Sequence, residues 1–568
     1  MLGERGVRAE AVDGTDDAAA SAPARPGRGP RTRSALRVLS ASRSALTPPP
    51  GSVWRDPVTW TVATLVFGAY FAISLFRLLR LSPGSYDLGI YTEYVKQLSQ
   101  LHAPIVDVLG SGFNLLGNHF QVAVAVIAPF FRLFPSPATL LFFQALATAV
   151  SVFPVVAAGK AFTGQSTGRL IGFAYGFSWG LQQMIDFDFH EIALAVPLLA
   201  FSVSALVRRR PAAVIAWAMP LVFVEESQGL TVAAIGLLLG ATAGFPSLVS
   251  RLPALPGGGR AVDEDGLGNS GIALWGGLFL MAWGLFWSAF AIIVIIPHFN
   301  PLHEYYFLKD AGTVGGGRPF SVGALLSQAG SGWPTKGPTL ALLLLPTAFA
   351  ALGSPVALLA LPSLALRFIP TNNLFWGTNF HYDATVMPIL FIAAAEAIGR
   401  FRIVSALSWP LAAGRASPSG PGAAPGPAGL ARDLFRAVRV GLARHGGAMM
   451  AAIAVALAFQ FPLSGLWQSS TYQLDAHVAA ADAAMAVVPT GATVQTNLDL
   501  LAPLAARTDT FWIGNAGNPV TRYIVFDGDN SGYSPAITDV PKFIAAQYPH
   551  DGYVEIFARD NVCVFRRP

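Results

Sequence analysis

The chain has 568 residues, of which 53% are hydrophobic and only 12% are charged, whereas soluble domains carry about 25% charged residues. This composition excludes an ordinary soluble enzyme and indicates an integral membrane protein. The formal charge of +5 comes from basic loops and tails, so we interpret it as a topology signal and expect no nucleic-acid partner. The single cysteine, Cys563, excludes an internal disulfide and a cysteine-based metal cluster.

The first 50 residues are rich in Ala, Arg, Pro and Ser and have no uninterrupted apolar run, which indicates a disordered basic tail and not a signal peptide. Apolar stretches then follow one another along the chain. Residues 118–134 are apolar too, but Pro129 and Arg132 interrupt them, so we expect an interfacial or re-entrant helix there. We predict about eleven transmembrane helices, at residues 57–79, 138–160, 168–185, 191–207, 211–224, 228–247, 272–297, 338–353, 355–369, 384–400 and 447–467.

The end of the chain differs in pattern from the apolar part. Five short segments, ATVQT, DTFWIG, YIVFD, YVEIF and VCVFR, read as strands after a helix, and turn sequences such as DGDNSG separate them. The expected fold is an all-α polytopic membrane protein with a small C-terminal α/β domain. Its predicted parts are a disordered tail (1–50), a transmembrane domain (51–403), a flexible basic linker (404–446), a last transmembrane helix (447–467) and the α/β domain (468–568).

Basic residues predict which side of the membrane each loop occupies. The positive-inside rule places the N-terminal tail in the cytoplasm, and alternation then puts Arg208, Arg209, Arg210 and the linker on the same side. We therefore expect a multi-pass protein of the plasma membrane with an extracytoplasmic C-terminal domain. The same threading gathers acidic residues and histidines at the outer ends of the spans, which predicts an outward-facing polar cavity.

The stretch SYDLGIYTEYV follows the first predicted span and contains Asp87 together with Tyr86 and Glu93, which are candidate substrate-binding residues. Asp87 suits a general base or a cation ligand in the predicted cavity. A structural alternative is a carboxylate that satisfies free N–H groups at the start of a helix.

The segment DFDFHE alternates acidic and aromatic residues before a histidine. In an extended conformation Asp186, Asp188 and His190 point to the same side, whereas on a helix they diverge. Together with Asp87 they form our predicted site for a divalent cation such as Mg²⁺ or Mn²⁺. A site for a hydroxyl-rich substrate and a solvated loop are the alternatives.

Other span ends supply further candidate substrate-binding residues. Glu225 and Glu226 in FVEES cannot face the same way on a helix, so at most one is expected to face the cavity. A lone histidine or tyrosine at such a position is usually an interfacial residue, and only the joint location on one side points to a site. The remaining candidates of this kind are His119, His303, His381, Tyr382 and Asp383.

Several of these motifs together resemble a known family. YDLGIYTEYVKQL, LGNHFQ, FPSPATLLFFQAL, DFHEIALAVPLLAFSVSAL, VEES and HYDATVMPILF follow one another over residues 57–400 and resemble the bacterial DUF2079 membrane-protein family. That family is similar to the GT-C glycosyltransferases, multi-spanning enzymes that take a sugar from a polyprenyl-phosphate donor at the outer membrane face. The resemblance implies that Asp87 matches the acidic residue of their first outer loop, although that loop contains no DD or DxD motif, only Asp87 followed by Glu93.

The expected function is the transfer of a sugar from a polyprenyl-phosphate donor to a glycan or lipid acceptor of the cell envelope. Asp87, Asp188 and His190 are the predicted catalytic residues, and Arg318 and Arg367 are predicted to neutralise the donor phosphate. One alternative is a transporter or flippase, but we find no clear inverted repeat and no charge in the middle of a span. A non-catalytic envelope assembly protein is the other alternative.

Overall fold

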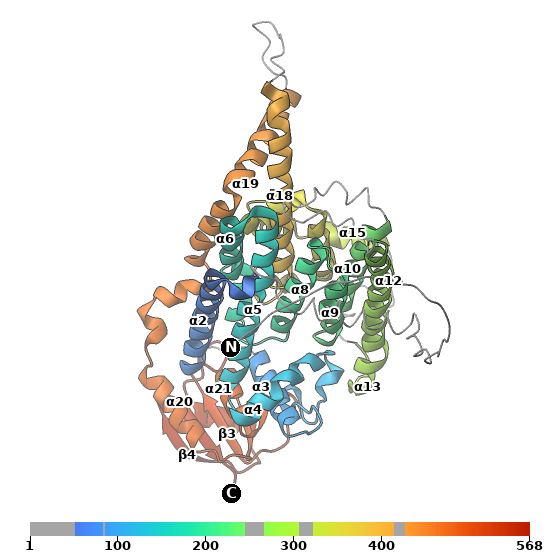
Figure 1. The fold of residues 1–568 in the computed structure, drawn as a ribbon. Helices are drawn as coiled ribbons and strands as arrows, with labels where there is room; N and C mark the ends of the chain where they lie inside the picture. The colour runs from blue at the N-terminus through green and yellow to red at the C-terminus, as the bar shows by residue number, and fades with distance from the viewer. Residues whose placement is uncertain (1–51, 83–85, 245–265, 306–321, 414–426) are drawn as a thin grey trace, which may run out of the picture. The chain divides into compact units, whose positions relative to one another are not determined.

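The computed structural model describes residues 52–82, 86–244, 266–305, 322–413 and 427–568. The chain divides into Met1–Pro49 and Pro50–Pro568. The predicted basic tail lies outside the described residues. The second unit is mainly helical and carries one small sheet near the C-terminus (Figure 1).

Helices of membrane-spanning length and composition are fewer than predicted. Among the described residues, four helices are long and apolar enough to cross a membrane, at Pro57–Leu79, Pro137–Thr163, Ser270–Phe299 and Gly429–Ala458. The first two are α2 and α5, and they match the predicted spans at 57–79 and 138–160. The predicted total of about eleven is not confirmed, because most other apolar stretches form helices below the roughly 20 residues that a straight crossing needs.

Two predicted spans illustrate how apolar stretches are divided. The stretch at 168–185 forms α6 (Gln165–Gly176) and α7 (Trp179–Asp186), with Ser178 in an extended conformation between them. The stretch at 211–224 forms α9 (Pro211–Ala218) and continues as a 3₁₀ turn. Such breaks keep the composition apolar, so a hydropathy pattern does not show them.

Prolines divide the two spans predicted at 338–353 and 355–369. Here α16 (Trp333–Leu344) is followed by 3₁₀ turns and then by α17 (Leu361–Phe368). Pro346 and Pro355 each stand at the start of one of these turns. Proline lacks the N–H group that a continuing α-helix needs, which explains the short pieces.

Helix α5 contacts α2, α6, α8 and α18, whereas α10 and α12 pack mainly against each other. Between α10 and α12 the backbones approach closely, since a Cβ atom on Gly236 would lie 2.6 Å from the carbonyl oxygen of Gly277. The remaining helices are α8 (Ile192–Val207), α10 (Gln228–Gly244), α12 (Gly266–Phe290), α13 (Ile296–Phe299), α15 (Val322–Gly330), α18 (Val386–Ala413) and α19 (Pro427–Ala458).

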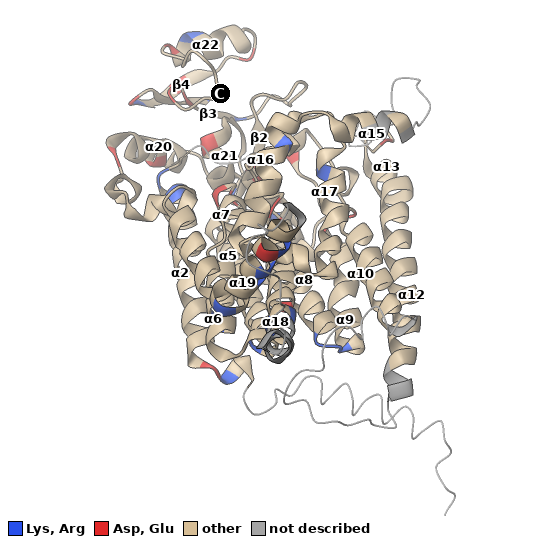
Figure 2. Cartoon of the chain, turned by 90° about the horizontal axis from the view of Figure 1, so that it is seen from above, with Lys and Arg blue, Asp and Glu red and all other residues tan. Residues whose placement is uncertain are grey.

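Two segments next to the helices matter for the site. The stretch 118–134, predicted to be an interfacial or re-entrant helix, forms a 3₁₀ segment at Val122–Ile127 and the short α4 (Ala128–Leu133). Helix α3 (Tyr86–Ser99) lies beside α4 and α21 (Leu498–Ala505). Figure 2 shows basic segments near the ends of α6 and α9, on the side of the helices away from the C-terminal sheet.

The predicted flexible linker at 404–446 is largely helical where it is described. Helix α18 continues to Ala413 and α19 already begins at Pro427, while residues 414–426 lie outside the described residues. Leu434, Val438 and Leu442 recur every four residues, a helical spacing that the many basic residues obscured.

The C-terminal domain contains the five predicted strands, β1 (Thr493–Thr496), β2 (Asp509–Trp512), β3 (Tyr523–Asp527), β4 (Val554–Arg559) and β5 (Val562–Arg566). Their order in the sheet is β2-β1-β3-β5-β4. Strand β1 pairs in parallel with β2 and β3, and β5 pairs antiparallel with β3 and β4. Helices α20 (Ala476–Ala486), α21 and α22 (Val540–Gln547) complete this domain.

Candidate functional site

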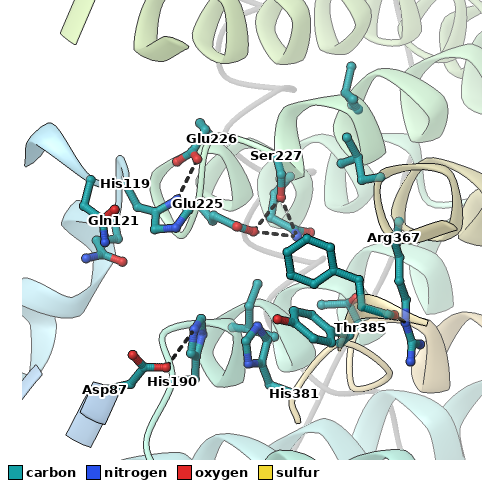
Figure 3. A pocket seen from close by; sticks show the side chains of 18 of the residues that line it. Asp87, His119, Gln121, His190, Glu225, Glu226, Ser227, Arg367, His381 and Thr385 are labelled. Atoms are coloured by element: carbon teal, nitrogen blue, oxygen red, sulfur yellow. Dashed lines mark hydrogen bonds and ion pairs between the residues drawn. The ribbon is translucent and has the colours of Figure 1, made fainter. Parts of the chain in front are cut away.

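A cavity of about 470 Å³ gathers side chains from segments that are far apart in the sequence (Figure 3). It lies among the start of α3, the loop before α4, the turn between α7 and α8, the turn before α10 and the loop between α17 and α18. The polar and charged residues that line it are Asp87, Tyr91, Asn118, His119, Gln121, His190, Glu225, Glu226, Ser227, Gln228, Ser288, Tyr305, Ser363, Arg367, His381, Tyr382 and Thr385.

Asp87 and His190 face each other across one side of the cavity. The Oδ2 atom of Asp87 lies 4.0 Å from Nε2 of His190, and Nδ1 of His190 lies 2.7 Å from Oε2 of Glu191. Burial raises the pKa of Asp87 although the His190 charge opposes this rise. For His190 burial lowers the pKa, but the Glu191 carboxylate outweighs it, so the pKa is raised overall. Both groups of this pair therefore hold a proton more tightly than the free side chains do.

The turn that carries His190 is fixed by Gln144 of α5. The Gln144 amide nitrogen donates a hydrogen bond to the carbonyl oxygen of Asp188 at 2.6 Å, and its oxygen accepts one from the His190 N–H at 3.0 Å. Asp188 has a φ of +66°, which is uncommon outside glycine. The buried glutamine thus holds a strained turn that aims the imidazole at the cavity.

His381 stacks on His190 with ring centroids 3.5 Å apart. Its Nδ1 atom is buried and has no hydrogen-bond partner among the described residues. Burial and the neighbouring His190 charge hold the pKa of His381 well below its usual range. One imidazole of the stack is therefore neutral and has a ring nitrogen available beside a cationic one.

On the other side of the cavity, His119 is paired with Glu226. The two side chains are 2.7 Å apart, and Glu226 also accepts hydrogen bonds from the Phe120 N–H at 2.9 Å and the Tyr305 hydroxyl at 2.7 Å. Burial opposes the charge on His119, but Glu226 and Glu225 raise its pKa to about 10. Burial and the Glu226 charge raise the pKa of Glu225 to about 6.

Both adjacent glutamates line the cavity, which corrects the expectation that at most one of them faces it. That expectation assumed a helix. The structure has a turn here, because the 3₁₀ segment Met219–Phe223 ends before the pair and α10 begins after it at Gln228.

A divalent cation fits this second group and not the predicted one. His119, Glu225 and Glu226 each offer a ligand atom, and these atoms lie within 4.8 Å of one another. One imidazole and two carboxylates form a donor set that suits Mn²⁺ and related ions. Among the described residues this is the group of three that meets such geometry.

The predicted cation ligands Asp186 and Asp188 contact Arg77 instead. The Arg77 guanidinium lies 2.7 Å from Oδ1 of Asp186 and 3.7 Å from Oδ1 of Asp188. Helix α7 continues to Asp186, so the extended conformation that would align these acids with His190 is not adopted. Asp188 acts on the site through the turn that it shares with His190, and its side chain does not line the cavity.

Arg367 lines the cavity, but its guanidinium is already bound. It contacts the Asp383 carboxylate and donates to the carbonyl oxygens of Phe375 and Gly377. Asp383 is fully buried behind it, while its neighbour Tyr382 reaches the cavity. Arg367 therefore has few free N–H donors for a donor phosphate, and the Asp383 carboxylate offsets its charge. The other predicted phosphate ligand, Arg318, lies outside the described residues.

Besides Asp383, three predicted substrate-binding residues lie away from the cavity. The Tyr86 hydroxyl donates to the Val108 carbonyl oxygen at 2.6 Å, and buried Glu93 accepts a hydrogen bond from the Val108 N–H at 3.0 Å. His303 has its Nδ1 atom 3.1 Å from the Pro297 carbonyl oxygen at an exposed position. Tyr86 and Glu93 thus fix the backbone at Val108, and none of the three residues lines the cavity.

Several residues that complete the site were not predicted from the sequence. The Tyr91 hydroxyl donates to Gln121 Oε1 at 2.8 Å and contacts the Glu191 carboxylate. Tyr91 and Glu191 stand in the motifs that were singled out, four residues after Asp87 and directly after His190. The sequence alone does not show that both side chains are buried beside polar partners. Gln144, a polar residue within an apolar span, was a signal that could have been used.

Comparisons with known proteins give one family and several distant structures. The family described as predicted membrane protein (DUF2079) matches residues 77–522. A search of curated proteins found no match. Two similar solved structures are ArnT from Cupriavidus metallidurans bound to undecaprenyl phosphate and the oligosaccharyltransferase AglB from Archaeoglobus fulgidus in complex with an inhibitory peptide and a dolichol-phosphate.

The first of these structures is 14% identical with a TM-score of 0.46, and the alignment covers 88% of this chain and 97% of that chain. The second is 12% identical with a TM-score of 0.33 and coverage of 89% and 74%. The Archaeoglobus fulgidus enzyme in complex with Zn and sulfate is 13% identical with a TM-score of 0.33, covering 88% of this chain and 73% of that one. At these values the reaction of this chain follows from none of them.

Proposed function

The chain belongs to the DUF2079 family of membrane proteins, and we propose that it is a glycosyltransferase that moves a sugar from a polyprenyl-phosphate donor to an envelope acceptor at the outer face of the membrane. One observation carries this proposal. Asp87, His190 and His381 on one side, and His119, Glu225 and Glu226 on the other, line a single cavity in a membrane protein.

The two sides of the cavity suit different steps of glycosyl transfer. Asp87 acts as the general base, because burial raises its pKa and thereby its affinity for the proton of an acceptor hydroxyl. The acceptor oxygen then forms a bond to the anomeric carbon while the bond from that carbon to the donor phosphate oxygen breaks. His190 lies beside Asp87 and stabilises the negative charge that moves onto the phosphate.

Part of the cavity wall suits a lipid-linked donor. Leu230 and Leu366 line the cavity, and they are 36% and 45% exposed, so the lining continues onto the surface of apolar helices. Ile292, in the π-helical segment Ala291–Ile295 after α12, belongs to the same wall. An apolar chain that enters here brings its phosphate to the polar part of the cavity.

A divalent cation at His119, Glu225 and Glu226 would add positive charge for the donor phosphate. In the cation-free protein the His119–Glu226 ion pair keeps this group nearly neutral.

The test is Asp87→Asn in the host cell, with Asp482→Asn at an exposed position of α20 as the matched control. We expect Asp87→Asn, but not the control, to alter the envelope glycans and to cause accumulation of a lipid-linked sugar. Unchanged glycans and no accumulating donor, with the variant present in the membrane at the normal level, would contradict the proposal.

A further inference from the structure

The C-terminal domain packs directly on the helix that carries Asp87. Leu501 and Ala502 of α21 belong to the same hydrophobic cluster as Leu88 and Tyr91 of α3. The helices meet at Gly89, where an added Cβ atom would lie 2.6 Å from Cδ2 and 2.8 Å from Cγ of Leu501. The leucine therefore fills the space that a side chain at position 89 would occupy, two residues from the predicted base.

Polar contacts connect the same two parts further along. Lys96 at the end of α3 is buried, and its Nζ donates to the carbonyl oxygen of Thr508 at 2.6 Å. Asn515 after β2 donates to the Val108 carbonyl oxygen at 2.8 Å, which also accepts the Tyr86 hydroxyl. Asn515 of the C-terminal domain and Tyr86 at the start of α3 thus bind the same backbone carbonyl group, that of Val108.

The aromatic residues of the C-terminal domain are also engaged in packing. Trp512 lies against the Tyr86 ring with centroids 5.0 Å apart, and Tyr523 is buried in the sheet. Neither presents a face for stacking on a sugar, although Tyr533 is 44% exposed. The domain contacts the site through α3 and not through an aromatic platform.

We infer that the C-terminal domain positions the catalytic base, with Leu501 seated on Gly89 as the positioning residue that sets where Asp87 lies relative to His190. This inference rests on the proposed function. Contacts closer than 3.0 Å are not tolerated between carbon atoms, so a methyl group at position 89 must displace the buried Leu501 side chain or shift α3 against α21. A displacement of about 1 Å at a reacting group lowers a rate about 100-fold.

The experiment is a size-complementation series in the full-length protein, consisting of Gly89→Ala, Leu501→Ala and the double variant. Gly68→Ala is the control, because Gly68 lies in α2 with nothing within 4 Å of an added Cβ atom. We expect Gly89→Ala to lower kcat about 10-fold to 100-fold with an unchanged KM for a polyprenyl-phosphate-linked sugar. The double variant recovers most of that loss, and the control equals the wild type.

Hydrogen exchange of the peptide covering residues 86–99 is measured on the same samples and needs no activity. We expect faster exchange there in Gly89→Ala, and also in Asn515→Ala, a milder variant that removes the side-chain hydrogen bond to the Val108 carbonyl oxygen. If the wild type transfers no sugar, the proposed function fails, whereas the exchange data still decide whether the domain holds α3. Wild-type kcat and exchange in folded Gly89→Ala, or no recovery in a folded double variant, would overturn the inference.

Discussion

A histidine lies among carboxylates in two regions of this protein, and the regions use it differently. In the cavity His190 has Glu191 at 2.7 Å and Asp87 at 4.0 Å. It also stacks on His381, whose Nδ1 atom has no hydrogen-bond partner in the part of the chain that the structure describes. The side chains here face a space of about 470 Å³ that is large enough for part of a substrate.

In the C-terminal domain His477, at the start of α20, lies 2.6 Å from Asp527 at the end of β3 and 3.2 Å from Asp560. The Asp527 carboxylate also accepts hydrogen bonds from the backbone N–H groups of Asp529 and Asn530, at 3.0 and 3.1 Å. These contacts connect the start of α20 to the sheet, and the polar atoms of the cluster bind one another. A cluster of titratable residues therefore indicates a functional site only where it also faces a cavity.

The largest expected difference between the regions concerns catalysis. His190→Gln should lower kcat about 100-fold to 1,000-fold, because it removes a cationic group beside the reacting atoms. His477→Gln should leave the turnover of each folded molecule unchanged. Turnover of a polyprenyl-phosphate-linked sugar, normalised to the folded protein, measures both. Equal losses in the two variants would contradict the distinction.

The pH profile sharpens the account of the cavity. Burial raises the pKa of Asp87 above its usual 3.8, and the base must be ionised to accept a proton. We therefore expect kcat/KM to fall about tenfold for each pH unit below that raised pKa. The acidic limb should lie at a higher pH than for an exposed aspartate. A rate that stays constant down to pH 4, while the protein remains folded, would exclude Asp87 as the base.

Within the cavity, the two adjacent glutamates should differ in their effect on stability. Glu226→Gln leaves the partly buried His119 cation without its carboxylate, so we expect a loss of about 1–3 kcal/mol in the free energy of unfolding. Glu225 is bound by Ser227 and Gln228, which are neutral, so Glu225→Gln should cost less. Thermal unfolding of both variants tests this, and a larger loss for Glu225→Gln would be inconsistent with the pairing.

The smallest expected effect is the pH dependence of the His477 contact. Burial lowers the pKa of His477, but Asp527 and Asp560 raise it overall. Its stabilising contribution is therefore present below the ordinary histidine pKa of about 6.5 and is lost as the pH rises through the raised value. The unfolding temperatures of wild type and His477→Ala should differ more at pH 6 than at pH 10. An equal difference at both would contradict this.

The sequence predicted the elements whose pattern is local. All five strands of the C-terminal domain lie where short apolar segments between turns indicated them, and α2 and α5 match their predicted spans. The number of transmembrane helices could not be predicted from such local patterns. Breaks at Ser178, Pro346 and Pro355 leave an apolar stretch apolar, so hydropathy alone does not locate them.

For the site, motifs indicated the segments better than the role of each residue. Asp87, His119, His190, Glu225 and His381 were all named from the sequence, and the structure brings them to one cavity. The pairing of Asp186 with Arg77 depends on a contact 109 positions apart. Such long-range contacts, and the burial of Tyr91 beside Glu191, follow from tertiary packing and not from spacing along the chain.

The most direct test of the central claim is a transfer assay with purified wild-type protein and Asp87→Asn in lipid nanodiscs, using polyprenyl-phosphate-linked sugars and extracted envelope acceptors. We expect the wild type to release polyprenyl phosphate and form a glycosylated product, and Asp87→Asn to do so at least about 100-fold more slowly. Equal rates for the two proteins, or no release by a folded wild type with any donor, would contradict the assignment of this cavity to glycosyl transfer.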